Sequence, residues 1–264
     1  MRSKGRRTYK ISLVKLALIF LGVIALLVIA NVLLSQKAVA PYKNMNSTKM
    51  ANKIVSKNTV VPDVSMKPND VTAPSSLSVI VNKSHPLNPI DYTPVDLIFP
   101  NVQTNGSLQV RSSLASKLSE MFLAAANAGS PLTIISAYRS YNYQNTVYNN
   151  YVSQYGQAET DTFSARPGYS EHQTGLAVDL GAPSGLCALD SCFANTNQGK
   201  WLANNSWLYG FILRYPEGKT DITGYKYEPW HFRYIGTDLA SKMNKSGINV
   251  MEEYFGVSGG KVYP

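Results

Sequence analysis

The chain has 264 residues, enough for one domain with extensions or for two small domains, and its 44% hydrophobic residues exclude a chain disordered throughout. Residues 1–62 hold 11 of the 25 Lys and Arg and no acid, so residues 63–264 carry the other 14 against all 16 acids, a net charge of −2. The overall +9 therefore belongs to the N-terminal part, and without a basic stripe interleaved with aromatic residues we expect no nucleic-acid binding.

The N-terminus predicts a membrane anchor. Residues 1–15 are basic, and Leu16–Leu34 is an uncharged run of 19 residues. As a helix with a rise of ~1.5 Å per residue, this run reaches roughly 28 Å, close to the ~30 Å hydrocarbon core of a bilayer. Basic residues before the run predict a single-pass protein of the cell membrane whose remainder lies outside the cytoplasm. The alternative is a signal peptide cleaved after Ala40, which would secrete the protein, but the run is longer than usual for a signal and Pro41 would follow the cut bond.

Residues 35–76 are rich in Lys, Asn, Ser, Thr, Val and Pro and show no helical or alternating apolar period. This composition predicts an extended, mostly disordered tether between the membrane and a folded domain. We expect a single folded domain over residues 77–264, beginning with a short strand at Leu77–Val81, where apolar residues alternate.

Within the domain, apolar residues at helical spacing predict a helix over Val110–Ala128, closed by Gly129. A β-branched strand is expected at Leu132–Ala137, and Ser140 is expected to cap a helix that runs to about Gln154. Further elements follow the same patterns: strands at Leu176–Leu180, Gly210–Tyr215 and His231–Ile235, and a closing helix at Thr237–Asn244. Helices and strands mixed without regular βαβ alternation predict an α+β fold, a small mixed sheet with flanking helices.

Two motifs contain residue types that bind a catalytic metal. Ser170–Asp179 includes His172 and Asp179, and Glu228–His231 follows 49 residues later. Zinc that does chemistry keeps three protein ligands from His, Asp, Glu or Cys and leaves a fourth position for water. Because two of the chain's three histidines fall in these motifs, we predict His172, Asp179 and His231 as ligands of Zn²⁺.

Glu228 fits the role of the base that accepts a proton from the attacking water. Pro229-Trp230 argues against a regular helical H-E-x-x-H site, so a turn at the head of a strand is expected to hold the base beside the metal. Taken singly, a histidine is usually a packing or surface residue, and we interpret His85, which has no acid or cysteine at ligand spacing, as structural. Glu171 is expected to face solvent, because neighbouring side chains alternate along extended backbone.

Cys187 and Cys192 are the two cysteines of the chain. A zinc ribbon would need a second pair. A local disulfide, in keeping with an oxidising location, is the favoured interpretation, and two free thiols are the alternative.

The pattern S-x-H-x-x-G-x-A-x-D followed by E-x-W-H resembles the zinc D-alanyl-D-alanine carboxypeptidases of the VanY type, over roughly residues 77–256. The resemblance implies a hedgehog/D,D-peptidase-like fold and peptidoglycan stem peptides as substrate, whose C-terminal D-alanine is removed with D,D or L,D specificity. It also implies that Arg139 reaches into the cleft to stabilise the oxyanion or to hold the substrate's terminal carboxylate, and that Gln144 and Ser170 hold the terminal residue. The Gly181–Gln198 loop is a departure that bears on substrate preference.

Two other functions fit the same motifs. One is a wall-cleaving endopeptidase. The other is a non-catalytic, zinc-containing module that binds cell-wall peptides, against which Glu228 counts, because a pure binding site has no use for a base. The sequence predicts no oligomeric state.

Overall fold

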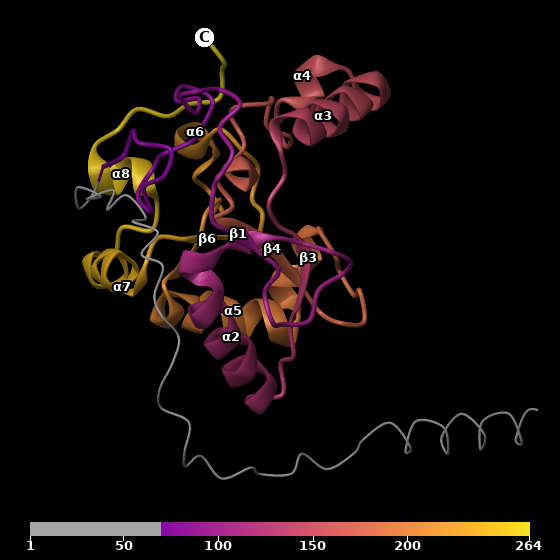
Figure 1. Ribbon diagram of the computed structural model, residues 1–264, viewed down its shortest axis with the longest axis vertical. Coiled ribbons are helices and arrows are strands. Elements are labelled where there is room, and N and C mark those ends of the chain that lie inside the picture. Colours follow the sequence, from indigo (N-terminus) through magenta and orange to yellow (C-terminus); the bar gives the residue numbers. More distant parts are fainter. Residues whose placement is uncertain (1–69) are drawn as a thin grey trace, which may run out of the picture. The chain divides into compact units, whose positions relative to one another are not determined.

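The computed structural model describes residues 70–264, in which helices and strands mix without regular alternation, as the α+β prediction expects (Figure 1). The strands are β1 (Leu97–Ile98), β2 (Val110–Arg111), β3 (Thr133–Ser136), β4 (Ala177–Gly181), β5 (Phe211–Leu213) and β6 (His231–Tyr234). The α-helices are α2 (Ser112–Asn127), α3 (Tyr141–Tyr155), α4 (Gln157–Thr160), α5 (Asn197–Asn205), α6 (Thr220–Thr223), α7 (Thr237–Ser246) and α8 (Met251–Phe255). Short 3₁₀ helices lie in the connections: η1 (Glu171–Thr174), η2 (Ser191–Asn195) and η3 (Ser206–Tyr209).

The main sheet has the strand order β3-β4-β6-β5, and every neighbouring pair in it is antiparallel. β1 and β2 form a separate antiparallel pair. The prediction of a mixed sheet is therefore wrong, because neighbouring strands of the main sheet are all antiparallel. After β3 the chain passes through α3 and α4 at one end of the sheet before it enters β4 (Figure 1). If β4 ran parallel to β3, the connection would instead have to cross back to the opposite end of the sheet before β4 began.

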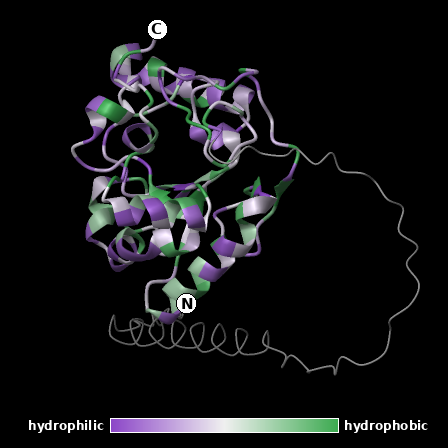
Figure 2. Ribbon diagram, turned by 90° about the vertical axis from the view of Figure 1, so that its left-hand side faces the viewer, coloured by the Kyte–Doolittle hydropathy of each residue, from purple (hydrophilic) through white to green (hydrophobic). Residues whose placement is uncertain are grey.

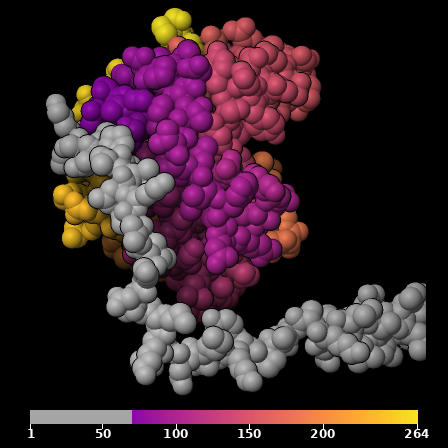
Figure 3. Space-filling view, in the orientation of Figure 1, coloured from indigo at the N-terminus to yellow at the C-terminus, as the bar shows by residue number. Residues whose placement is uncertain are grey.

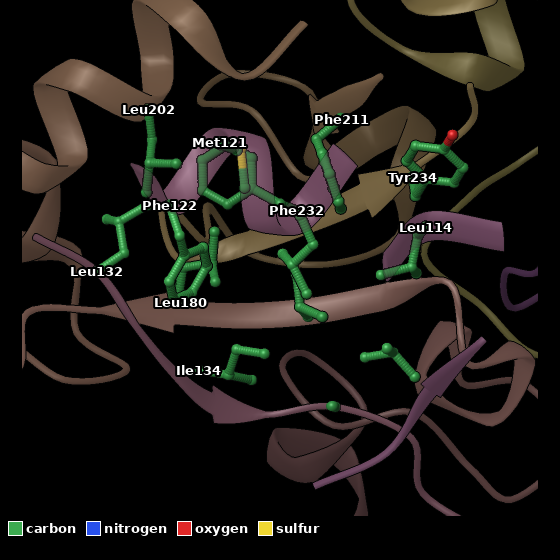
Figure 4. Close-up of a cluster of buried hydrophobic side chains, with 14 of the residues drawn as sticks. Leu114, Met121, Phe122, Leu132, Ile134, Leu180, Leu202, Phe211, Phe232 and Tyr234 are labelled. Carbon is green, nitrogen blue, oxygen red and sulfur yellow. The ribbon is translucent and has the colours of Figure 1, made fainter. Parts of the chain in front are cut away.

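The core lies between the sheet and the helices α2 and α5. β4 contributes Val178 and Leu180, and α5 contributes Leu202 (Figure 4). α2 contributes a stripe of buried side chains at helical spacing: Leu114, Leu118, Met121, Phe122 and Ala125. A helix that buries one face has a polar outer face, so hydrophilic and hydrophobic residues follow one another along its sequence, as the colours of the helices show (Figure 2). Because side chains alternate along a strand, this packing turns Asp179 away from the core.

Most of the predicted elements are present, with shifted ends. The helix expected from Val110 begins at Ser112, because Val110–Arg111 pairs with β1. Ser140 caps α3 as predicted, and its hydroxyl accepts a hydrogen bond of 3.2 Å from the backbone N–H of Tyr143. β5, β6 and α7 lie within or next to their predicted ranges.

The expected strand at Leu77–Val81 does not form. The segment is irregular but buried, and its carbonyl groups are used by a side chain instead of a neighbouring strand. Arg233 donates from Nη2 to the carbonyl oxygens of Leu77 and Val79, each at 2.9 Å. Residues before the predicted domain start at residue 77 also contact the domain. Val71 packs on the core, and the carbonyl of Ser75 accepts a hydrogen bond of 2.6 Å from Arg111.

The basic segment 1–15, the anchor 16–34 and most of the tether 35–76 lie outside the described residues. Between residues 70 and 264, no helix combines the length and the apolar character needed to cross a bilayer. His85 has the structural role expected of it, with Nδ1 3.0 Å from Oδ1 of Asn82 in a turn.

Cys187 and Cys192 form the predicted disulfide. Thiol titration of the denatured, unreduced protein should therefore detect no reactive cysteine, and both thiols should become reactive after reduction. Two titratable thiols before reduction would contradict the bond.

Candidate metal centre

The three predicted ligands lie together where β4 and β6 pair. The strand register places Asp179 directly opposite His231, and η1 places His172 just before β4. Asp179 Oδ2 is 3.2 Å from His172 Nε2, and Asp179 Oδ1 is 3.1 Å from His231 Nδ1. One possible ligand atom from each residue lies within 4.8 Å of the other two, and all three side chains are buried. Two ring nitrogens and a carboxylate thus converge on one point.

Gly175 makes the turn that brings Asp179 back towards His172. It ends η1 with a φ of +68°, in the left-handed region that glycine adopts without steric cost. A Cβ at this position would also lie 3.0 Å from the side chains of Arg111 and Leu97. Glycine therefore fits this turn between His172 and β4 both in backbone conformation and in the space available.

The residues present fit a zinc ion. His172 Nδ1 is 2.7 Å from the carbonyl oxygen of Ala137, which can only accept, so Nδ1 carries the proton and Nε2 keeps its lone pair towards Asp179. Metal-bound histidines commonly hold their other N–H in this way. Asp179 Oδ1 is buried, and although His231 Nδ1 lies 3.1 Å away the two atoms form no hydrogen bond, an arrangement that is costly unless another group satisfies the oxygen. Two imidazoles and one carboxylate form the donor set of a catalytic zinc site.

The two histidines have opposite protonation tendencies. Burial, with the charge of Arg139, lowers the pKa of His172 to about 4. Burial acts in the same direction on His231, but the carboxylates of Asp179 and Glu171 outweigh it and raise its pKa to about 9. Because a ligand imidazole must be neutral at its metal-binding nitrogen, metal binding releases the proton of His231.

Glu228 lies in the turn before β6, with Oε2 3.6 Å from His231 Nδ1. The turn is held by two backbone hydrogen bonds of 3.1 Å, from Glu228 N–H to the Tyr215 carbonyl and from His231 N–H to the Glu228 carbonyl. Burial raises the pKa of Glu228 to about 8. A divalent cation at the ligands would lower it again, since nearby positive charge favours the carboxylate. Glu228 is therefore placed beside the metal position as a titratable group.

The metal group lines a cleft of about 710 Å³, together with Arg139, Gln144 and Ser170. The backbone N–H of Arg139 donates to the His172 carbonyl at 3.1 Å, which places its side chain beside the metal group. The Nε atom of Arg139 is buried without a hydrogen-bond partner. Within residues 70–264 Arg139 forms no ion pair, and the arginines that do are Arg111, Arg166, Arg214 and Arg233. Gln144 donates from Nε2 to the Ala165 carbonyl at 2.7 Å, whereas its buried Oε1 has no partner. Both side chains are thus free to bind a polar ligand.

The walls of the cleft come from distant parts of the chain. Tyr143, Val147 and Tyr151 of α3 form one wall. Leu189, which lies between the disulfide-bonded Cys187 and Cys192, also lines the cleft. Leu108 lies in the cleft as well, and the surface is indented between α3–α4 and the segment around residues 100–110 (Figure 3). The Gly181–Gln198 loop therefore borders the cleft, which is the condition for an effect on substrate preference.

Comparison with known proteins places this site in a family. A model of the VanY family, described as D-alanyl-D-alanine carboxypeptidase, matches residues 107–237, which include all the site residues above. The Bacillus subtilis (strain 168) protein YodJ is 41% identical over 187 residues, 69% of this chain and 68% of that protein. The chain belongs to the VanY family. This agrees with the resemblance carried by the two motifs.

Solved structures of VanY-family proteins share the fold. The LdcB LD-carboxypeptidase is 40% identical with a TM-score of 0.65, covering 70% of this chain and 89% of that one. A Glu-to-Ala variant of the vancomycin resistance D,D-pentapeptidase VanY, in complex with Zn(II), is 33% identical with a TM-score of 0.57, covering 68% of this chain and 98% of that one.

One residue of this VanY-family site was misjudged from the sequence. Glu171 was expected to face solvent, but its side chain is fully buried and forms ion pairs of 2.7 Å with Arg214 and Arg233. The expectation fails because Glu171 lies in the 3₁₀ helix η1, where neighbouring side chains do not alternate between two faces. A signal was available: Arg233 lies in a strand flanked by apolar residues, and a buried arginine requires a buried carboxylate.

Replacing Arg139 by Lys should preserve zinc binding and lower the rate of hydrolysis. Its guanidinium can contact two oxygens at once, and an ammonium cannot reproduce that geometry. The loss should appear in kcat/KM with a normal zinc content, measured by elemental analysis of the same preparation. Wild-type kinetics in this variant would remove Arg139 from substrate binding.

Proposed function

We propose that this protein is a zinc carboxypeptidase that removes the C-terminal D-alanine from peptidoglycan stem peptides. The observation that carries the proposal is the buried Glu228, placed next to a three-ligand group in a cleft that also contains the unpaired Arg139. Membership of the VanY family and the zinc complex of a VanY relative support it.

The zinc ligands, Glu228 and Arg139 have different roles in peptide hydrolysis. Zinc, when bound by His172, Asp179 and His231, supplies a Lewis acid that activates water. Glu228 accepts the proton released by the attacking water and later delivers it to the leaving amine. Arg139 holds the terminal carboxylate or the developing oxyanion of the substrate.

Two further residues suit the substrate's terminal residue. Gln144 lines the cleft, and its Oε1 has no hydrogen-bond partner, whereas Nε2 donates to the Ala165 carbonyl. Ser170, which is buried, also lines the cleft and carries a hydroxyl. A free acceptor and a hydroxyl can bind polar groups of a terminal alanine residue.

The alternatives account for less of this geometry. A module that only binds wall peptides has no use for a buried base beside its metal ligands. An endopeptidase cuts inside a chain, where a free carboxylate is absent next to the bond, so only the oxyanion would remain for Arg139 to bind.

The proposal is tested by digesting purified muropeptides with the full-length protein and identifying the products by mass spectrometry. Loss of one alanine from a pentapeptide supports the proposal with D,D specificity, and loss of one from a tetrapeptide supports it with L,D specificity. Opening of cross-linked dimers without release of a terminal alanine would favour the endopeptidase, and binding without any cleavage would favour the binding module.

We also propose that the catalytic domain acts outside the cytoplasm, held at the cell membrane by residues 16–34. The basic residues before this apolar run and the use of both cysteines in a disulfide support this location. Alkaline extraction of membranes and N-terminal sequencing of the recovered protein test it. A mature N-terminus at Pro41 would show cleavage after Ala40 and a secreted protein instead.

A further inference from the structure

A buried ion-pair network lies directly behind one of the metal ligands. Glu171 Oε1 accepts hydrogen bonds of 2.7 Å from Arg214 Nε and from Arg233 Nη1. The other oxygen of the same carboxylate, Oε2, lies 3.5 Å from Nε2 of His231. The side chains of all three ion-paired residues have no exposed surface. One carboxylate therefore joins two buried arginines to the ring of His231.

The position of Glu171 is restrained by the partners of its two arginines. Arg214 also binds Glu252 of α8 through two hydrogen bonds of 2.9 and 2.7 Å. Arg233 is held by the carbonyl oxygens of the segment that precedes residue 80. Two carboxylates thus balance two guanidinium groups, and both arginines hold the same oxygen of Glu171.

His231 needs this carboxylate when a metal is bound. Its Nδ1 faces Asp179 and Glu228, so Nδ1 is the nitrogen that approaches a metal at the three ligands. Nε2 must then carry the proton and donate it to an acceptor. His231 Nε2 and Glu171 Oε2 are both buried, and neither has a hydrogen-bond partner within residues 70–264. The 3.5 Å approach is the contact that can satisfy both atoms.

We propose that Glu171 is a positioning residue that accepts the Nε2–H of His231 and thereby presents Nδ1 to the metal. The inference rests on the metal site of the proposed function and not on peptide cleavage. Carboxylates that orient a metal-bound histidine typically contribute 10–100-fold to metal affinity. Glu171 is ideally restrained for this task, because its second oxygen is fixed by two arginines.

The test is the zinc affinity of full-length Glu171→Gln, measured by competition with a chromophoric chelator. The amide is neutral and must turn its NH₂ group either towards the two arginines or towards His231, so one of the contacts is lost. We expect zinc binding to weaken by about 10–100-fold. The Co²⁺-substituted protein should also show a changed d–d absorption spectrum, because the orientation of a ligand ring changes.

The matched control is Glu252→Gln, which removes a buried carboxylate from the same Arg214 without touching His231. Both variants should melt at lower temperature than the wild type, but Glu252→Gln should keep its zinc affinity and Co²⁺ spectrum. Equal loss of zinc affinity in the two variants, or wild-type affinity in Glu171→Gln, would overturn the proposal.

Glu171→Asp provides a second variant should the amide prevent folding. It keeps the charge between the arginines but withdraws the carboxylate from His231 by one methylene group. We again expect weaker zinc binding than in Glu252→Gln, and unchanged binding would overturn the proposal. Since zinc affinity is measured without peptide, failure of this inference remains distinct from failure to cleave muropeptides.

Discussion

Replacing Glu228 by Ala should leave a protein that binds zinc and stem peptide and scarcely cleaves. The metal keeps His172, Asp179 and His231, which satisfy the three protein positions of a catalytic zinc site. Peptide binding should persist through Arg139 and the metal. The proton transfer from water to the leaving amine is what the variant loses, a contribution of typically 10²–10⁴ in rate.

This result requires three measurements on one preparation: zinc content, muropeptide affinity and kcat. Glu253→Gln is a suitable control, because Glu253 is a partly exposed acid of α8 that pairs with Lys219 and does not line the cleft. A fully active Glu228→Ala protein would refute the role of the base. Glu171 could not replace it, since its carboxylate is committed to Arg214 and Arg233.

The ligand residues were predictable because most of their geometry is local. His172 and Asp179 belong to one turn-and-strand unit, and Glu228 lies in the turn before β6, of which His231 is the first residue. The pairing of β4 with β6, which puts Asp179 opposite His231, involves residues distant in the sequence and has no local signal. The expectation that the two motifs meet rested instead on their residue types, which together supply the three protein ligands of a catalytic zinc site.

Two of the errors share a physical origin, since each concerns a buried polar group with distant partners. Leu77–Val81 alternates as a strand does, but its carbonyls bind Arg233, which lies more than 150 residues away in the chain. Glu171 appeared to be an ordinary surface acid because its arginines follow it by 43 and 62 residues. Local sequence patterns indicate which residues are buried, but they do not indicate which buried charged groups contact each other.

Replacing Asp179 by Ala should abolish zinc binding and hydrolysis together. Asp179 lies between the two histidines, 3.2 Å from His172 Nε2 and 3.1 Å from His231 Nδ1, and it carries the negative charge of the ligand set. Its loss leaves two imidazoles, one ligand fewer than the three protein ligands of a catalytic zinc site. The effect on zinc affinity should exceed the 10–100-fold that typically follows loss of an outer-shell partner.

The matched control is His85→Ala, which removes the one histidine outside the motifs and should retain zinc and activity. His172→Ala and His231→Ala should behave like Asp179→Ala, with zinc content and rate falling in parallel. Full zinc occupancy in Asp179→Ala would contradict the ligand assignment. Glu228, whose Oε2 is 3.6 Å from His231 Nδ1, would then be the nearest carboxylate able to complete the set. Because one carboxylate cannot be both ligand and free base, that outcome would also contradict the role assigned to Glu228.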